Sequence, residues 1–125
     1  MKVSAAGWGN YKDASFDVTR GLYTTTPTTS GSWKGASAAS KYTKPVSKGT
    51  LLTTGASDRN SVLGIYDLAG NVTEWTLEKS PINSTPCPIH GGVYYGNGSD
   101  SPMHLRGYTN TTYASYDSGF RAALW

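Results

Sequence analysis

The amino-acid sequence predicts one domain, residues 1–125, of the α+β class, in which antiparallel strands and irregular loops dominate and helix is scarce. A chain of 125 residues is long enough to bury one hydrophobic core. Hardly any stretch has apolar residues at the three-and-four spacing of a helix without an intervening Gly, Pro or Thr run. Aromatic residues make up 12% of the chain, which argues against disorder.

Composition and charge exclude several function classes. The net charge is only +3, and the lysines are spread from Lys2 to Lys79 without a cluster, so we expect no nucleic-acid binding. No apolar run approaches the roughly 20 residues of a membrane-spanning helix. The single cysteine, Cys87, excludes an internal disulfide, and the first residues lack the apolar stretch of a secretion signal.

Two segments alternate in the way that strands do. In residues 72–78, Thr73, Trp75 and Leu77 point to one side, which predicts a strand with one buried face. Residues 120–125 alternate in the same way, which predicts a strand that closes the chain.

Residues 24–50 have a different composition, opening with a run of Thr that contains Pro and Ser and ends at Gly31. This composition predicts a long surface loop, and we expect Trp33 and Tyr42 to anchor it.

Three motifs carry a resemblance to a known family. They are Gly-Ile-Tyr-Asp-Leu-Ala-Gly-Asn-Val-Thr-Glu-Trp-Thr at residues 64–76, His-Gly-Gly-Val-Tyr at 90–94, and Gly-Phe-Arg-Ala-Ala at 119–123. In this order they resemble the C-terminal half of the formylglycine-generating-enzyme, or sulfatase-modifying-factor, family over roughly residues 60–125. Trp8-Gly9-Asn10 echoes a further motif of that family. The resemblance implies a C-type-lectin-like fold, in agreement with the scarcity of helix.

The same resemblance predicts that the chain is not an enzyme of this family. Catalytic members have two cysteines, which bind copper and the substrate thiol, at the positions of Gly96 and Ser101. Neither residue can supply a thiolate, so we expect no copper site. Cys87 lies before the Gly91-Gly92 pair, and we expect it to be inert. His90 and His104 lack a third ligand and are expected to be surface residues.

A calcium site is a second property that the resemblance implies. The family's ligands carry over to the carboxylates of Asp67 and Glu74 and to the backbone carbonyls of Gly70 and Val72. Several oxygens in a tight turn suit a hard cation. The alternative is that Asp67 caps a turn that ends at Gly70 and that Glu74 is an ordinary strand residue. The sequence leaves both interpretations open.

Residues 93–118 have the composition of a contact surface. Five of the nine tyrosines fall here among Ser, Gly, Asn, Asp and Thr, and no Lys or Glu follows Lys79. Antibody paratopes share this composition because Tyr gives a large contact area at low entropy cost, while Ser, Gly and Asn give adaptable hydrogen bonds. We therefore predict a binding segment.

This segment is also similar to the diversified segment of lectin-fold variable proteins from diversity-generating retroelements. Randomised adenines in Asn codons yield Tyr, Asn, Ser, Asp, Thr, His, Gly or Arg but not Lys, Glu, Gln or Trp. The candidate variable, ligand-binding positions are Tyr94, Tyr95, Asn97, Asp100, His104, Tyr108, Asn110, Tyr113, Ser115 and Tyr116. The fixed positions would be Gly91, Gly92, Arg106, Gly119, Phe120 and Arg121, with Arg121 as a buried hydrogen-bonding strut.

These observations predict a non-catalytic binding domain that recognises a macromolecular ligand, a protein receptor before a glycan. Two alternatives stay open. One is a degenerate or fragmentary formylglycine-generating-type enzyme. The other is a carbohydrate-binding lectin, although the Glu-Pro-Asn and Gln-Pro-Asp motifs of sugar-binding C-type lectins are missing. A phage tail tip or a bacterial cell surface is the expected location, either as a protein without an export signal or as a domain of a longer surface protein.

Overall fold

Short strands make up nearly all of the regular structure. The computed structural model describes residues 7 and 9–121. The strands are β1 (Phe16–Val18), β2 (Leu22–Thr24), β3 (Lys34–Gly35), β4 (Tyr42–Lys44), β5 (Leu51–Leu52), β6 (Ser61–Val62), β7 (Ile65–Tyr66), β8 (Thr73–Trp75), β9 (Cys87–His90), β10 (Arg106–Thr109) and β11 (Ser118–Phe120). Among the described residues, the only helical element is one 3-10 turn, η1 (Asp58–Asn60). The predicted dominance of strands and loops is confirmed, and this turn is all that the described residues contribute to the helical part of the α+β class.

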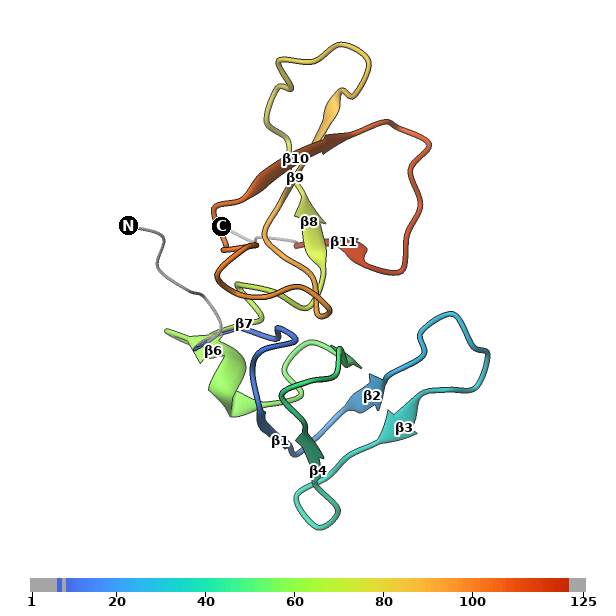
Figure 1. Ribbon diagram of the computed structural model, residues 1–125, viewed down its shortest axis with the longest axis vertical. Helices are drawn as coiled ribbons and strands as arrows, with labels where there is room; N and C mark the ends of the chain where they lie inside the picture. Colours follow the sequence, from blue (N-terminus) through green and yellow to red (C-terminus); the bar gives the residue numbers. More distant parts are fainter. Residues whose placement is uncertain (1–6, 8, 122–125) are drawn as a thin grey trace.

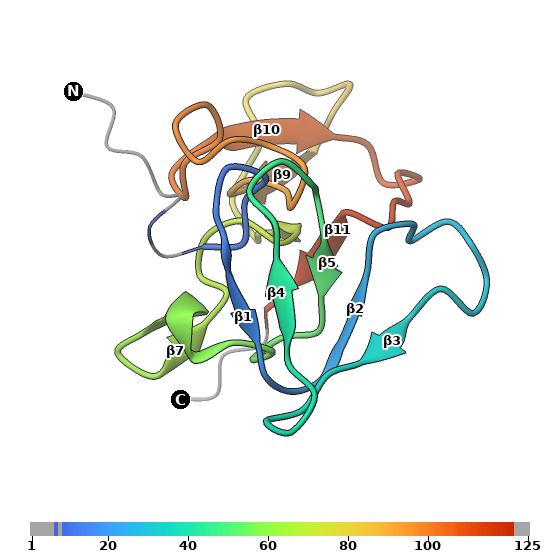
Figure 2. The same ribbon diagram turned by 60° about the horizontal axis from the view of Figure 1, so that its bottom comes forward.

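The strands pair into small sheets, antiparallel with one exception. β1 pairs with β4, β6 pairs with β7, and β2 lies between β3 and β5, as Figure 2 shows for β1 beside β4 and β2 beside β3. The largest sheet has the order β10-β9-β8-β11 and lies at one end of the molecule (Figure 1). Within it, β11 runs parallel to β8, with Phe120 opposite Trp75. The predicted predominance of antiparallel pairing is confirmed for the described residues.

The hydrophobic core lies in the other half of the molecule, around β1, β4 and β5. It consists of Tyr11, Ala14, Phe16, Val18, Leu52, Ala56 and Ala69. Lys44 is fully buried beside it and donates hydrogen bonds to the backbone oxygens of Ala14 (2.7 Å) and Tyr11. Its ammonium group lies 5.5 Å from the centre of the Phe16 ring. Burial, together with the nearby charge of Arg59, lowers the pKa of Lys44 to about 8.

Two Gly-Asn pairs, Gly9-Asn10 and Gly70-Asn71, join the halves of the chain. Asn10 bridges to Gly70 in parallel, and its side-chain Nδ2 donates to Asn71 Oδ1 (2.8 Å). Asn71 also accepts from the backbone N of Leu52 (3.0 Å) and donates to its O (2.9 Å). A Cβ at Gly70 would lie 2.6 Å from the Asn10 oxygen, so only glycine fits there. The echo of a family motif at residues 8–10 is thus a structural partner of the motif at 64–76, although Trp8 itself lies outside the described residues.

The prediction of a surface loop over residues 24–50 is partly wrong. The segment contains β3 and β4, and Lys44 and Thr50 within it have no exposed surface. Tyr42 does anchor the segment, since its ring stacks on Tyr23 with centroids 4.0 Å apart, whereas Trp33 is exposed. The sequence signal failed because strands of two or three residues are too short to show a regular alternation.

The predicted strand over residues 72–78 is shorter than expected, and its buried face is wrong. β8 ends at Trp75, its three residues are all half-buried, and Leu77 is fully exposed. Alternation identifies which residues share a side but not whether anything packs against that side. The last strand, Ser118–Phe120, lies earlier than predicted and overlaps the expected closing strand only at Phe120, which is exposed. Residues 122–125 lie outside the described residues.

Candidate functional site

Aromatic side chains gather at the end of the large sheet where β8 pairs with the edge strand β11. The rings of Trp75 and Tyr113 lie 6.4 Å apart, centroid to centroid. Tyr95 donates its phenol hydrogen to Asp117 Oδ2 (2.5 Å), and this hydrogen bond, followed by burial, raises the pKa of Tyr95. Nearby Tyr116 and Tyr113 add to the rise. We refer to Trp75, Tyr95, Tyr113, Tyr116 and Phe120 as the aromatic face; apart from half-buried Trp75, its members are 42% to 82% exposed.

Tyr94 was predicted to bind ligand, and the structure contradicts this. Its side chain is buried, packs edge-to-face against Tyr95 at 5.0 Å, and its backbone N donates to Asn71 O (2.9 Å). Tyr94 and Tyr95 are the two central residues of a turn closed by the hydrogen bond from Gly96 N to Val93 O (3.0 Å), which leaves the Tyr95 ring available for contact while the Tyr94 ring is buried.

The remaining predicted ligand-binding residues fall into separate places. Asn110 and Ser115 belong to the same loop as Tyr113 and Tyr116, between β10 and β11. Asn97 and Asp100 form their own loop, with Asn97 Nδ2 donating to Asp100 Oδ2 (3.1 Å). Tyr108 is half-buried on β10, at the sheet edge farthest from β11. His104 lines a cavity with Glu74, His90 and Arg106. The ten residues therefore do not form one surface.

Residues 93–118 are attached to the rest of the molecule largely through their own main chain. The backbone oxygens of this segment accept hydrogen bonds from residues outside it. These bonds are Tyr11 Oη to Ser101 O (2.7 Å), Lys12 N to Gly96 O (2.8 Å) and Thr73 N to Asp117 O (2.8 Å). Exposed side chains of the segment could change without removing these attachments.

Gly96 and Ser101, where the resemblance places the family's catalytic cysteines, lie against each other. A Cβ built on Gly96 would be 3.5 Å from Ser101 Oγ. Side chains at the two positions are therefore in van der Waals contact, so two thiols placed there could meet. Here one position has no side chain and the other a hydroxyl, which leaves neither a redox nucleophile nor a soft metal ligand at this place.

Three of the four residues expected to bind calcium, Asp67, Gly70 and Val72, lie in the turn before β8, and the fourth, Glu74, lies within β8. Asp67 is buried and accepts a hydrogen bond from Gly55 N (3.0 Å), and burial raises its pKa. Asp67, Gly70, Val72 and Glu74 line the same cavity, and their carboxylate and carbonyl oxygens are the donors that a hard cation takes. Within the described range no three His, Cys, Asp or Glu side chains are placed to hold a metal, so carbonyl oxygens would have to complete the site.

Arg121 holds this turn against β8. Its Nε and NH2 groups bind both carboxylate oxygens of Glu74 (3.1 and 2.5 Å), and its NH1 and NH2 groups donate to the backbone oxygens of Tyr66 and Asp67 (3.0 and 2.9 Å). The expected hydrogen-bonding strut is present. Its expected burial is wrong, because the side chain is 32% exposed.

The sequence motifs and the strand-rich fold point to one family. The chain belongs to the family of sulfatase-modifying factor enzyme 1-like domains, whose model matches residues 4–124. No curated protein and no solved structure gives a significant match. No helix in the described part of the chain is long and apolar enough to cross a membrane, as the sequence predicted.

Sequence reasoning missed two parts of the site. Trp75 was assigned to a buried face and Phe120 to the fixed framework, yet both belong to the aromatic face. His90 and Arg106, which were set aside, share a cavity with His104. Spacing along the chain could not have found this cavity, because His90 and Arg106 are brought together only by the pairing of β9 with β10.

Proposed function

We propose that the protein is a non-catalytic binding domain with a C-type-lectin-like fold, which recognises a protein receptor through the aromatic face. The observation that carries this proposal is the exposure of Tyr95, Tyr113 and Tyr116 together at one sheet edge. Grouped exposed aromatic rings are typical of contact surfaces, and a fixed ring such as Tyr95 loses little entropy on binding. The lack of thiols at Gly96 and Ser101 favours binding over oxidation chemistry.

A capture experiment with matched variants tests the proposal. The immobilised domain is exposed to a surface extract of candidate host cells, and any captured protein is purified and its affinity measured by biolayer interferometry. Tyr113→Ala/Tyr116→Ala should weaken binding by at least about 100-fold, as expected when two central aromatic contacts are removed. Val46→Ser, which alters an exposed apolar residue elsewhere, should leave the affinity unchanged.

Two outcomes would overturn this assignment. A captured protein that binds the double variant as well as the wild type would not use the aromatic face. Copper-dependent oxidation of a sulfatase-type cysteine peptide by the purified chain would favour the degenerate-enzyme alternative.

We further propose that a retroelement diversifies residues 93–118 and that the domain is displayed on a phage tail tip or a bacterial surface. The main-chain attachment of the segment supports this, because side chains can vary while Ser101 O, Gly96 O and Asp117 O keep their partners. Sequencing the locus in a population should reveal an adjacent reverse transcriptase and variation at adenines within this segment. Uniform variation along the whole chain would contradict the proposal.

We also propose that Asp67, Glu74 and the carbonyls of Gly70 and Val72 hold calcium in a structural role. A cation would offset the charge of the buried Asp67 carboxylate, which the burial-raised pKa marks as unfavourable. Isothermal titration calorimetry should detect binding that Glu74→Gln abolishes, and a chelator should lower the melting temperature. Absence of both effects would contradict the calcium proposal. The turn would then be held by the hydrogen bonds of Arg121.

A further inference from the structure

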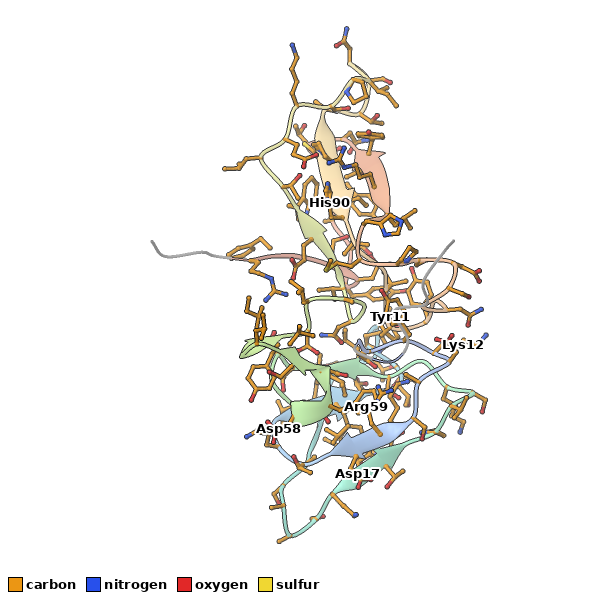
Figure 3. The ribbon with its side chains drawn as sticks, turned by 90° about the vertical axis from the view of Figure 1, so that its left-hand side faces the viewer. Tyr11, Lys12, Asp17, Asp58, Arg59 and His90 are labelled. Atoms are coloured by element: carbon orange, nitrogen blue, oxygen red, sulfur yellow. The ribbon has the colours of Figure 1, made fainter. Side chains whose placement is uncertain are left out.

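A cavity of about 630 Å³ lies on the face of the large sheet opposite the aromatic face. Glu74 and His90 are paired across β8 and β9, and His90 is paired with Arg106 across β9 and β10, so these three side chains share one face. Trp75, the neighbour of Glu74, points to the other. Figure 3 shows His90 in the half of the molecule away from Asp17 and Asp58.

The hydrogen-bond donors of this cavity are more available than its carboxylates. Glu74 is bound by Arg121 through both oxygens, and Asp67 is buried and accepts a hydrogen bond from Gly55 N (3.0 Å). Arg106, by contrast, makes one hydrogen bond within the described residues, from NH2 to Glu78 Oε1 (3.2 Å), and keeps further N–H donors. His104 has no hydrogen-bond partner in the described part of the chain.

The rest of the lining suits a small apolar body. Leu68, Val72 and Met103 contribute side-chain carbon, while Gly70 and Gly91 leave space. The volume falls in the range of pockets that hold small organic ligands, about 300–1,000 Å³. An apolar wall beside the Arg106 guanidinium and the His104 ring is complementary to an organic acid.

We propose that this cavity binds the carboxylate of a molecule with a short apolar body, with Arg106 and His104 contacting the carboxylate and Leu68, Val72 and Met103 contacting the apolar part. Arg106 shares its charge with Glu78, so a singly charged carboxylate balances the site better than a phosphate dianion would. The carboxylate could belong to a free organic acid or to the C-terminus of a peptide with an apolar last residue.

Proton NMR of the two histidine rings tests the proposal on the whole chain, because His90 and His104 are the only histidines. One arm titrates hexanoate against its uncharged analogue, 1-hexanol, up to about 10 mM, which detects dissociation constants near 1 mM. The second arm titrates an acetylated tripeptide ending in leucine, with a free or an amidated C-terminus. His104→Gln assigns the two signals by leaving only that of His90.

The proposal expects hexanoate, but not hexanol, to shift the histidine signals. Arg106→Gln should raise the dissociation constant at least tenfold, while Arg20→Gln, which removes an exposed arginine paired with Asp58 elsewhere, should not. Binding of the free tripeptide but not the amide identifies a peptide C-terminus as a source; binding of hexanoate alone identifies a free acid. No histidine shift with either carboxylate, equal binding of hexanol, or unchanged affinity in Arg106→Gln would overturn the inference.

Discussion

Buried apolar side chains are unevenly divided between the two parts of the molecule. The part up to Ala69 contains the buried Tyr11, Phe16, Val18 and the other core residues, whereas Tyr94 is the single large apolar side chain that is buried among residues 72–121 of the described chain. Both parts expose large apolar side chains, Leu22, Trp33, Val46, Leu63 and Ile65 in the first and Leu77, Ile82, Tyr95, Leu105, Tyr113, Tyr116 and Phe120 in the later one, so the parts differ chiefly in what they bury. Figure 1 shows the division, with β1–β4 at one end and β8–β11 at the other.

This difference indicates a separation of tasks. The first part stabilises the fold through its core and the Asn10–Asn71 junction, while the second presents side chains on strands that are fixed by main-chain bonds. Substitutions should therefore affect stability strongly in the first part and weakly on the surface of the second.

Asn71→Ala should have the largest effect. It removes three buried hydrogen bonds, to Asn10 and to both backbone groups of Leu52, and leaves their partners unsatisfied. We expect the free energy of unfolding in urea to fall by about 3–5 kcal/mol. Asn83→Ala, at an exposed position, should change it by less than about 0.5 kcal/mol. Similar values for the two variants would show that the junction does not hold the parts together.

Lys44 should make stability depend on pH within the core-bearing part. Because its pKa in the fold is about 8, against an ordinary 10.5, the folded state loses the proton first and stability rises with pH between these values. The free energy of unfolding of the wild type minus that of Lys44→Met should therefore increase by about 2 kcal/mol from pH 8 to pH 10. Taking the difference cancels the titration of Tyr11 and other groups common to both. Parallel pH profiles of the two proteins would show that the pKa of Lys44 is not lowered in the folded state.

An engineered disulfide in the second part should change the free energy of unfolding by a comparable amount. Gly96→Cys/Ser101→Cys should form a disulfide, since the Cβ position at 96 lies 3.5 Å from the side-chain oxygen at 101. Closing so short a loop should stabilise the fold by about 2 kcal/mol at most. Thiol titration should then count one free thiol, that of Cys87, where the unpaired chain would show three. Three free thiols after mild oxidation would mean that the two positions do not face each other.

The smallest effect is expected on the exposed surface. Leu77→Ser and Tyr116→Ala should each change the free energy of unfolding by less than about 0.5 kcal/mol, because neither side chain is buried. A loss above about 2 kcal/mol for Leu77→Ser would restore the buried face that alternation in residues 72–78 predicted.

Local patterns predicted the scarcity of helix and the family, because turn glycines and short motifs leave a direct trace in the sequence. The tyrosine-rich segment also predicted three members of the aromatic face. The sequence could not separate Tyr94 from Tyr95, since the two differ only in which side of the chain is covered. It also missed the burial of Lys44, because a lysine within a polar segment carries no sign that its amine meets two carbonyls.

The Asn10–Asn71 junction has a consequence for how the chain folds. Asn10 must find a residue 61 positions later, and Tyr11 hydrogen-bonds to Ser101, 90 positions away. Such distant partners raise the entropy cost of the folding transition state and are typical of domains that fold in milliseconds to seconds. On the ribosome, the first residues would leave the exit tunnel long before their partners are made. The early part would then stay unfolded until the late part is synthesised, and during that time it would be accessible to proteases and chaperones.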